Sequence, residues 1–124
     1  YVTEGSKLFA FDGTNFTNEI NFSEEIKSLK SSNEYLIVSL KKKAIIFDNA
    51  MNEVIQFSSD IAFDYSLNTA FFEKNTAFLA TKEFGVLITT LSQPTTYLEI
   101  HPEGPLSNNV FSIAANNNNL WVVY

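Results

Sequence analysis

The sequence has no cysteine, four glycines, three prolines and one histidine among its 124 residues. Without cysteine, disulfide bonds and thiolate metal sites are excluded. With so few glycines a phosphate-binding loop is not expected, and neither a GxxxxGK nor a GxGxxG pattern occurs. The HExxH and GxSxG patterns of metalloproteases and serine hydrolases are also absent. The sequence therefore lacks the common signatures of enzymes and nucleotide-binding proteins.

Positive charge and long apolar runs are scarce as well. Eight basic residues stand against fourteen acidic ones, which gives a net charge of −6. Nucleic-acid binding needs a basic face, so we expect no nucleic-acid partner. No apolar run approaches the roughly 20 residues of a membrane-spanning helix, so we expect no transmembrane segment. The first residues, YVTEGSKLF, lack the basic and apolar regions of a signal peptide, and we interpret them as an internal start within a longer chain.

Apolar and aromatic residues, in contrast, are abundant. They make up 45% and 15% of the chain, and twelve of the aromatics are phenylalanines. This is ample for a packed core, and such aromatics favour strands over helices. Charged residues reach only 18%, too few for a long disordered tail. We therefore predict an all-β fold.

A repeat emerges when the chain is aligned with itself. Four similar segments begin at Tyr1, Ile37, Leu79 and Trp121, in steps of 36, 42 and 42 along the chain. Each begins with a short apolar strand, and the first three continue through a polar turn into a second one. A third strand is then predicted at Thr17–Phe22, Glu53–Phe57 and Tyr97–Ile100. A strand that precedes each later segment is predicted at Ile26–Leu29, Thr69–Phe72 and Val110–Ala114.

Four strands at a period of roughly 40 residues are typical of β-propeller blades. We therefore predict part of one β-propeller domain over residues 1–124, with about three four-stranded blades of a larger propeller, for which we expect seven. The repeat units are approximately 1–25, 26–68, 69–109 and 110–124. A sandwich of about ten short strands is the rival all-β interpretation. A single helical turn within Phe22–Glu34 is a further alternative, because apolar residues recur there at helical spacing.

Asparagine and aspartate mark the predicted turns. Asn116–Asn119 separates two apolar runs and is predicted to be a tight hairpin turn, because Asn tolerates positive φ. Ser31–Glu34 and Glu73–Thr76 are the equivalent turns, each with an Asn. Asp12 and Asp48 occupy the same repeat position at the end of a strand, and we interpret both as turn-forming residues.

Few residues suggest chemistry. His101, the only histidine, lies between two prolines in a predicted surface connection, without a partner nucleophile or acid in the flanking sequence. Adjacent Glu24 and Glu25 are interpreted as solvated. Lys41–Lys43 forms a basic cluster on a predicted hairpin turn, and could contact an anionic partner or only keep the turn soluble. We assign no catalytic, metal, cofactor or binding residue, expect no cofactor, and predict a protein that is not an enzyme.

The stretch GPLSNNVFSIAANNNNLWVVY resembles the propeller repeats of many exported Bacteroidetes proteins. The residues that carry the resemblance are Leu106, Asn108, Asn109, Val110, Ile113, Leu120, Trp121 and Val122. Two branches share this repeat: the periplasmic sensors of hybrid two-component regulators, and the PorZ-type propeller proteins of the type IX secretion system. The sequence here is closer to the PorZ type, because Val38-Ser39 and Ala80-Thr81 stand where the sensors carry Val-Gly-Thr.

The PorZ-like resemblance implies a non-enzymatic accessory protein, exported to the outer-membrane surface, where it supports a sortase complex. That complex attaches cargo to anionic lipopolysaccharide, so a protein partner and this lipid are the implied contacts. Such proteins have two propellers and a C-terminal sandwich domain, and this chain would cover part of the first propeller. The sensor branch implies instead a periplasmic domain that recognises a polysaccharide breakdown product and signals to a kinase. A propeller hydrolase or lyase finds no support in the residues.

Overall fold

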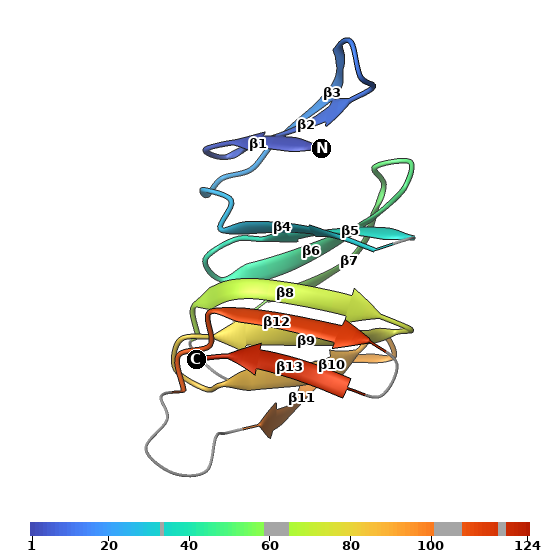
Figure 1. Ribbon diagram of the computed structural model, residues 1–124. Helices are drawn as coiled ribbons and strands as arrows, with labels where there is room; N and C mark the ends of the chain where they lie inside the picture. Colours follow the sequence, from blue (N-terminus) through green and yellow to red (C-terminus); the bar gives the residue numbers. More distant parts are fainter. Residues whose placement is uncertain (33, 59–64, 101–107, 117–118) are drawn as a thin grey trace.

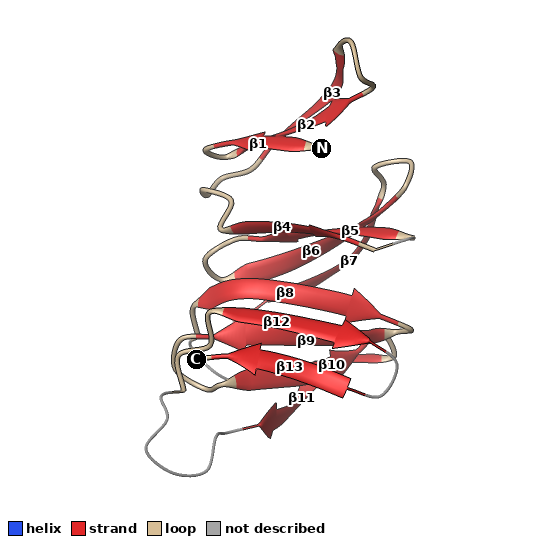
Figure 2. Ribbon diagram, viewed as in Figure 1, coloured by secondary structure: helices blue, strands red, loops and turns tan. Residues whose placement is uncertain are grey.

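The computed structural model describes residues 1–32, 34–58, 65–100, 108–116 and 119–124 (Figure 1). Every regular element within these ranges is a β-strand (Figure 2). The strands form antiparallel sheets of two to four strands. The predicted all-β class is therefore confirmed.

The strands are grouped into four sheets in chain order. Sheet 1 contains β1 (Val2–Glu4), β2 (Lys7–Phe11) and β3 (Phe16–Asn21). Sheet 2 contains β4 (Ser28–Ser31), β5 (Tyr35–Ser39), β6 (Lys43–Asp48) and β7 (Glu53–Ser58). Sheet 3 contains β8 (Leu67–Glu73), β9 (Thr76–Thr81), β10 (Val86–Thr90) and β11 (Gln93–Ile100). Sheet 4 contains β12 (Ser112–Asn116) and β13 (Asn119–Val123). Each strand pairs with the next one in its sheet.

Most predicted strands are present with small shifts of their ends, and β4 shows why a boundary moves. It begins at Ser28, although the sequence predicted Ile26. The amide of Ile26 instead donates to the carbonyl of Gly5 in sheet 1 at 2.9 Å. The segment is therefore tied to the neighbouring sheet before its own strand begins. The helical turn considered within Phe22–Glu34 is not found among the described residues of that segment, which contribute β4 instead.

The four sheets stack on one another, and an apolar core fills each space between successive sheets (Figure 1). The core between sheets 1 and 2 contains Leu8, Leu36, Val38, Leu40, Ile45 and Phe47. The core between sheets 2 and 3 includes Ile37, Ala44, Ile46, Phe57, Leu67, Ala70, Phe72, Leu79 and Leu87. The core between sheets 3 and 4 contains Ala80, Val86, Val110 and Ile113, with Phe71, Phe78, Leu120 and Val122 packed on it. Sheets 2 and 3 are thus apolar on both faces, as sheets buried between sheets must be.

Each sheet has two faces, which we name by their neighbours. The leading face is the one toward the preceding sheet, and the trailing face is the one toward the following sheet. In β5, Val38 belongs to the leading face and Ile37 to the trailing face, because they lie in different cores. In β9, Leu79 is on the leading face and Phe78 packs on the trailing side.

This assignment corrects the repeat alignment by one residue. The sequence placed Ile37, Leu79 and Trp121 at equivalent positions, in two steps of 42. In the structure Leu79 shares its face with Val38 instead, an offset of 41, because Val38 pairs with Leu29 as Leu79 pairs with Ala70. Trp121 then corresponds to Phe78, an offset of 43. A one-residue slip exchanges the two faces of a strand, so the correction changes which side chains share a core.

The cause of the shift is a longer turn in sheet 3. Ser39 pairs with Ala44 and encloses residues 40–43, whereas Ala80 pairs with Val86 and encloses residues 81–85. The extra residue restores the offset to 42 in the following strand. Two hydrogen bonds within the turn stabilise it: the Thr81 hydroxyl accepts from the Phe84 amide and donates to the Gly85 carbonyl, both at 2.9 Å.

Ser39 gives a test of this corrected register. With an offset of 41 it corresponds to Ala80, and its fully buried hydroxyl has no hydrogen-bond partner among the residues that the structure describes. A buried hydroxyl without a partner costs free energy, so we expect Ser39→Ala to leave the stability unchanged or to raise it by up to about 1 kcal/mol. Urea unfolding measures the effect. The control Thr81→Ala, which removes a hydroxyl with two partners, should lower stability by about 1–3 kcal/mol. A loss of that size in Ser39→Ala would contradict the assignment.

The predicted hairpin turns are described in part. In Glu73–Thr76 both central residues, Lys74 and Asn75, have positive φ, at 48° and 76°. This conformation is the one that two-residue hairpins favour, and it explains the asparagine. β12 and β13 pair at Asn116 and Asn119, and the residues between them lie outside the described part of the chain, as does Asn33 of the third turn.

Candidate functional site

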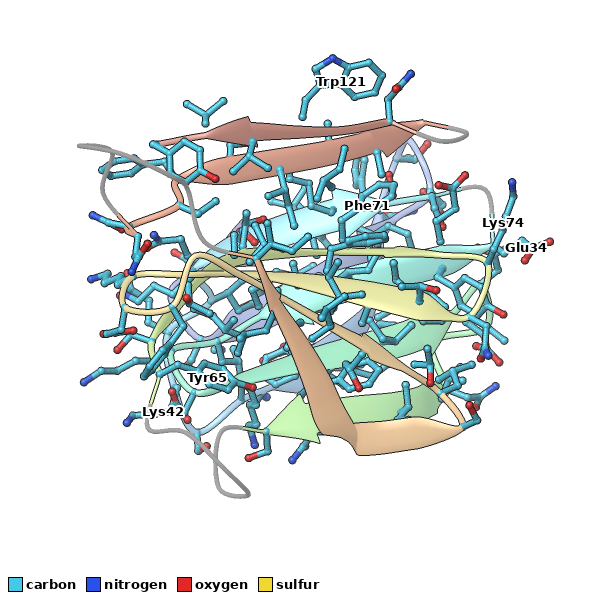
Figure 3. All side chains as sticks on the ribbon, turned by 90° about the horizontal axis from the view of Figure 1, so that it is seen from below. Glu34, Lys42, Tyr65, Phe71, Lys74 and Trp121 are labelled. Atoms are coloured by element: carbon cyan, nitrogen blue, oxygen red, sulfur yellow. The ribbon has the colours of Figure 1, made fainter. Side chains whose placement is uncertain are left out.

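A hollow of about 310 Å³ lies at one end of the stack, where the β4–β5 and β8–β9 hairpins of sheets 2 and 3 come together. Its lining combines aromatic, hydroxyl, amide and charged side chains: Ser32, Glu34, Tyr35, Phe72, Glu73, Lys74 and Asn75. Figure 3 shows Glu34 and Lys74 close to each other at this end, with Lys42 at the opposite end. The hollow is thus formed by equivalent hairpins of neighbouring sheets.

The aromatic part of the hollow is well anchored. The rings of Tyr35 and Phe72 meet edge to face, with centroids 5.0 Å apart and an interplanar angle of 87°. Phe72 is fully buried in the core between sheets 2 and 3. Ser32 fixes the entry to β5, because its hydroxyl accepts from the Tyr35 amide at 3.2 Å and its amide donates to the Tyr35 carbonyl at 2.8 Å. The position of Tyr35 is therefore set by both backbone and core contacts.

The chemistry of the hollow suits binding. The lining holds two carboxylates, an ammonium group, an amide, two hydroxyl groups and two aromatic rings, so the hollow offers both donors and acceptors. Such a lining can hold a hydroxylated ligand, with an aromatic ring available for an apolar contact. Among the described residues of the lining there is no histidine and no serine paired with a base.

A second hollow of about 260 Å³ lies on sheet 1 and is lined by Tyr1, Ala10, Phe11, Asp12 and Thr17. Asp12 is already engaged there, because its Oδ1 accepts from the amides of Thr14 and Asn15, each at 2.8 Å. The amide of Asn15, followed by that of Thr14, holds the pKa of Asp12 below its ordinary value. This carboxylate stabilises a turn.

Asp48 has the same role in sheet 2. Its carboxylate accepts from the side chain of Asn52 at 3.0 Å and from the amides of Asn52 and Ala50 at 2.8 and 2.9 Å. These bonds, above all the one from the Asn52 side chain, lower the pKa of Asp48. The interpretation of Asp12 and Asp48 as turn-forming residues is therefore confirmed.

Glu24 and Glu25 bind different partners. Glu24 Oε2 accepts from the amide of Lys41 at 3.2 Å, whereas Glu25 forms an ion pair with Lys27 at 2.6 Å. The hydrogen bond from Lys27 lowers the pKa of Glu25. Sheet 3 has a similar contact with the roles exchanged: Glu83, in the turn between β9 and β10, accepts through Oε2 from the amide of Ser66, just before β8, at 2.8 Å. In both sheets a glutamate thus links the residues before the first strand to the turn between the second and third strands.

The other predicted sites stay separate. Lys41–Lys43 forms the turn between β5 and β6, closed by a 2.8 Å bond from the Leu40 amide to the Lys43 carbonyl. It lies at the end of the stack opposite the first hollow (Figure 3). His101 lies outside the described residues. Among the residues that are described, no three His, Cys, Asp or Glu side chains are grouped so that they could hold a metal ion.

The first hollow was not predicted from the sequence. Its two hairpins, Ser31–Glu34 and Glu73–Thr76, were predicted as turns, each independently of the other. The signal that could have found the hollow is their equivalence in the repeat, since equivalent turns of stacked sheets become neighbours.

Comparisons with known proteins add no relative. No family model matches the chain, and neither the curated proteins nor the solved structures contain a match. Within the described ranges, no helix is long and apolar enough to cross a membrane.

Proposed function

We propose that the chain forms part of a β-propeller that acts as a non-enzymatic binding scaffold. The observation that carries the proposal is the regular stacking of meander sheets. Sheets 2 and 3 each have four antiparallel strands in chain order, and equivalent strands follow at sequence offsets between 41 and 43. This is the composition of propeller blades. A sandwich would bury one face of each of two sheets, whereas sheets 2 and 3 are buried on both faces.

Contacts between the first strands support the same arrangement, because first strands lie nearest the axis of a propeller. Ser28 of β4 and Thr69 of β8 share a hydroxyl hydrogen bond of 2.9 Å across the two sheets. One sheet further, the Asn68 side chain donates to Asn109 Oδ1 at 2.9 Å and to the Val110 carbonyl at 2.6 Å, just before β12. The stack is therefore joined along one edge, as blades around an axis are.

For the biological role we propose a PorZ-like accessory of the type IX secretion system at the outer-membrane surface. This rests on the resemblance carried by Leu106 to Val122, and the partners it implies are a sortase complex and anionic lipopolysaccharide. The Lys41–Lys43 turn is the part of the chain that suits an anionic surface, since three cationic side chains follow one another there.

The test is binding of the chain to lipopolysaccharide vesicles and to neutral phospholipid vesicles, at low and moderate salt. We expect binding to lipopolysaccharide only, and a loss on the order of tenfold or more when all three lysines of Lys41–Lys43 are changed to Gln, because each contributes about 1 kcal/mol near an anionic surface. The control Lys74→Gln, at the other end of the stack, should bind as the unchanged chain does. A loss of binding free energy in Lys74→Gln of about one third of that in the triple variant, in proportion to the charges removed, would show only an effect of net charge and would refute the lysine turn as a contact.

The second candidate is the periplasmic glycan-sensing propeller, and the hollow beside Tyr35 favours it. Binding of neutral oligosaccharides to the chain is measured as a second experiment. Saturable binding of an oligosaccharide, lost in Glu34→Ala and unchanged by substitution of Lys41–Lys43, combined with no binding to lipopolysaccharide, would replace the first candidate by the second. The two roles thus use opposite ends of the stack and are separable by mutation.

A further inference from the structure

The hollow beside Tyr35 lies between the two inner sheets of the stack. Sheets 2 and 3 each have a described sheet on both sides, so the hollow does not depend on what packs on sheets 1 and 4 (Figure 1). Its volume of about 310 Å³ is at the lower end of the range for small-ligand sites. The hollow therefore has room for a small ligand or for one unit of a longer one.

The aromatic pair in the hollow is not required by the repeat. Tyr35 of sheet 2 and Phe72 of sheet 3 meet at 5.0 Å between ring centroids. In the corrected register their equivalents at the junction of sheets 3 and 4 are Thr76 and Ala115, which carry no rings. Successive sheets thus pack without an aromatic pair at this position. The pair sets this junction apart from the next one and gives the hollow an aromatic surface.

The walls of the hollow are held in place by backbone contacts. Lys74 and Asn75 form a two-residue turn with positive φ, and the Asn75 carbonyl accepts from the Leu91 amide at 3.1 Å. On the other wall, the Ser32 amide donates to the Tyr35 carbonyl at 2.8 Å. Both hairpins are therefore fixed before a ligand binds, which reduces the ordering cost of binding.

The charge of the lining is negative. Glu34 and Glu73 contribute two carboxylates, and Lys74 contributes one ammonium group. The ion pairs found among the described residues involve other side chains, so the carboxylates are available to a ligand. Asp48, the strand partner of Tyr35, adds a further negative charge nearby. A cationic group is therefore attracted to this hollow, and an anionic one is repelled.

The donors of the lining favour hydroxyl groups around that cation. Lys74 and the amide hydrogens of Asn75 need acceptor oxygens in the ligand. A lysine or arginine side chain of a protein partner carries donors only, and it would leave both without an acceptor. A sugar ring supplies hydroxyl oxygens as acceptors and an apolar face for Tyr35. An aminated sugar thus matches more of the lining than a basic side chain does.

We propose that the hollow binds an amino sugar, with its protonated amino group at the carboxylate of Glu34 and its hydroxyl groups at Lys74 and Asn75. This ligand class rests on the second candidate function, the glycan-binding propeller, and makes it specific. Glu34 and Lys74 lie close to each other in Figure 3, on the two hairpins that enclose the hollow. An ammonium group between a carboxylate and an aromatic ring is stabilised by both.

A matched set of tetrasaccharides with the same glucose backbone and linkage tests the proposal. One carries an amine on each ring, the second has that amine N-acetylated, and the third has a hydroxyl group in its place. Each is titrated into the chain in a calorimeter at slightly acidic pH and about 0.15 M salt, where long-range attraction is screened. We expect the amine form to bind on the order of tenfold more tightly than the other two, because it alone can form a charge-assisted hydrogen bond with Glu34.

Glu34→Gln keeps the shape of the side chain and removes its charge. It should weaken binding of the amine form on the order of tenfold and leave the other two forms nearly unchanged. Lys74→Gln should instead strengthen binding of the amine form, because it removes the cation that competes for the carboxylates. The control Glu53→Gln makes the same change of net charge at an exposed residue of β7 outside the lining, and should bind as the unchanged chain does. Circular dichroism of each variant confirms that the fold is retained.

Several results would overturn the amino-sugar site. Equal losses in Glu34→Gln and Glu53→Gln would show only an effect of net charge. Binding of tetralysine as tight as that of the amine form, with the same dependence on Glu34, would show that ammonium groups suffice and that the ligand is not a sugar. Equal binding of all the tetrasaccharides would refute the amine preference and keep the glycan-binding candidate. If none of them binds, both fail, and the lipopolysaccharide vesicles still decide the first candidate by themselves.

Discussion

Phe72→Ala should lower the free energy of unfolding by about 3–5 kcal/mol, the usual cost of removing a buried phenylalanine ring from a packed core. Phe72 has no exposed surface, and its ring fills the core between sheets 2 and 3 against Tyr35. A domain of this size has a stability of roughly 5–15 kcal/mol, so one substitution removes a large part of it. Thermal unfolding should show a decrease in Tm on the order of 10–20 °C.

Phe71 supplies the matched control. It precedes Phe72 in β8 but lies on the opposite face, toward β12 and β13, where it is only half-buried and 6.5 Å from the ring of Phe78 (Figure 3). Phe71→Ala should therefore cost clearly less than Phe72→Ala. Both variants are measured at the same protein concentration as the unchanged chain. A larger cost for Phe71→Ala would show that β8 is turned by one residue from the arrangement described.

Local patterns predicted the strands and the turn residues. Short apolar runs between polar turns specify strands directly, and the aspartates that follow β2 and end β6 bind amides only a few residues away. Because these contacts are local, Asp12 and Asp48 could be assigned from their position alone. The same holds for Asn75, whose positive φ follows from the two-residue turn between β8 and β9.

The register between repeats could not be predicted in the same way. Val38, Leu79 and Val122 are all apolar, and so are Ile37, Phe78 and Trp121 beside them. When both faces of a sheet are buried, the sequence loses the alternation that tells one face from the other. The register depends on the turn at residues 81–85, which is one residue longer than the turn at residues 40–43 and is closed by the hydrogen bonds of Thr81.

The hollow beside Tyr35 was missed for a different reason. Its lining comes from two hairpins in different repeat units, and nothing within either hairpin indicates that the other is adjacent. Adjacency is a property of the stack, which requires the repeat and the correct register together. A site between equivalent turns is therefore found only when equivalent positions are compared across sheets.

Asn68→Asp should cause the second largest loss of stability, because it replaces a hydrogen-bond donor between sheets 3 and 4 by an acceptor. The Asn68 amide group donates to two acceptors, Asn109 Oδ1 and the Val110 carbonyl. A carboxylate of the same shape can donate to neither and faces the carbonyl oxygen with negative charge. We expect a loss of about 2–3 kcal/mol at neutral pH, measured by urea unfolding. Asn68→Ala, which removes the donor without adding charge, should cost about 1 kcal/mol.

The pH dependence separates the lost donor from the added charge. Partial burial beside a carbonyl oxygen raises the pKa of the new carboxyl group in the folded chain above its unfolded value of about 4. Such a group stabilises the fold below the unfolded pKa, and this contribution is lost as the pH rises through the folded pKa. The difference between Asn68→Asp and the unchanged chain should therefore shrink as the pH falls toward 4, where the protonated group can donate again. For Asn68→Ala the difference should not change with pH. A deficit of Asn68→Asp that stays constant from pH 7 to 4 would mean that Asn68 does not hold the two sheets together through its amide hydrogens.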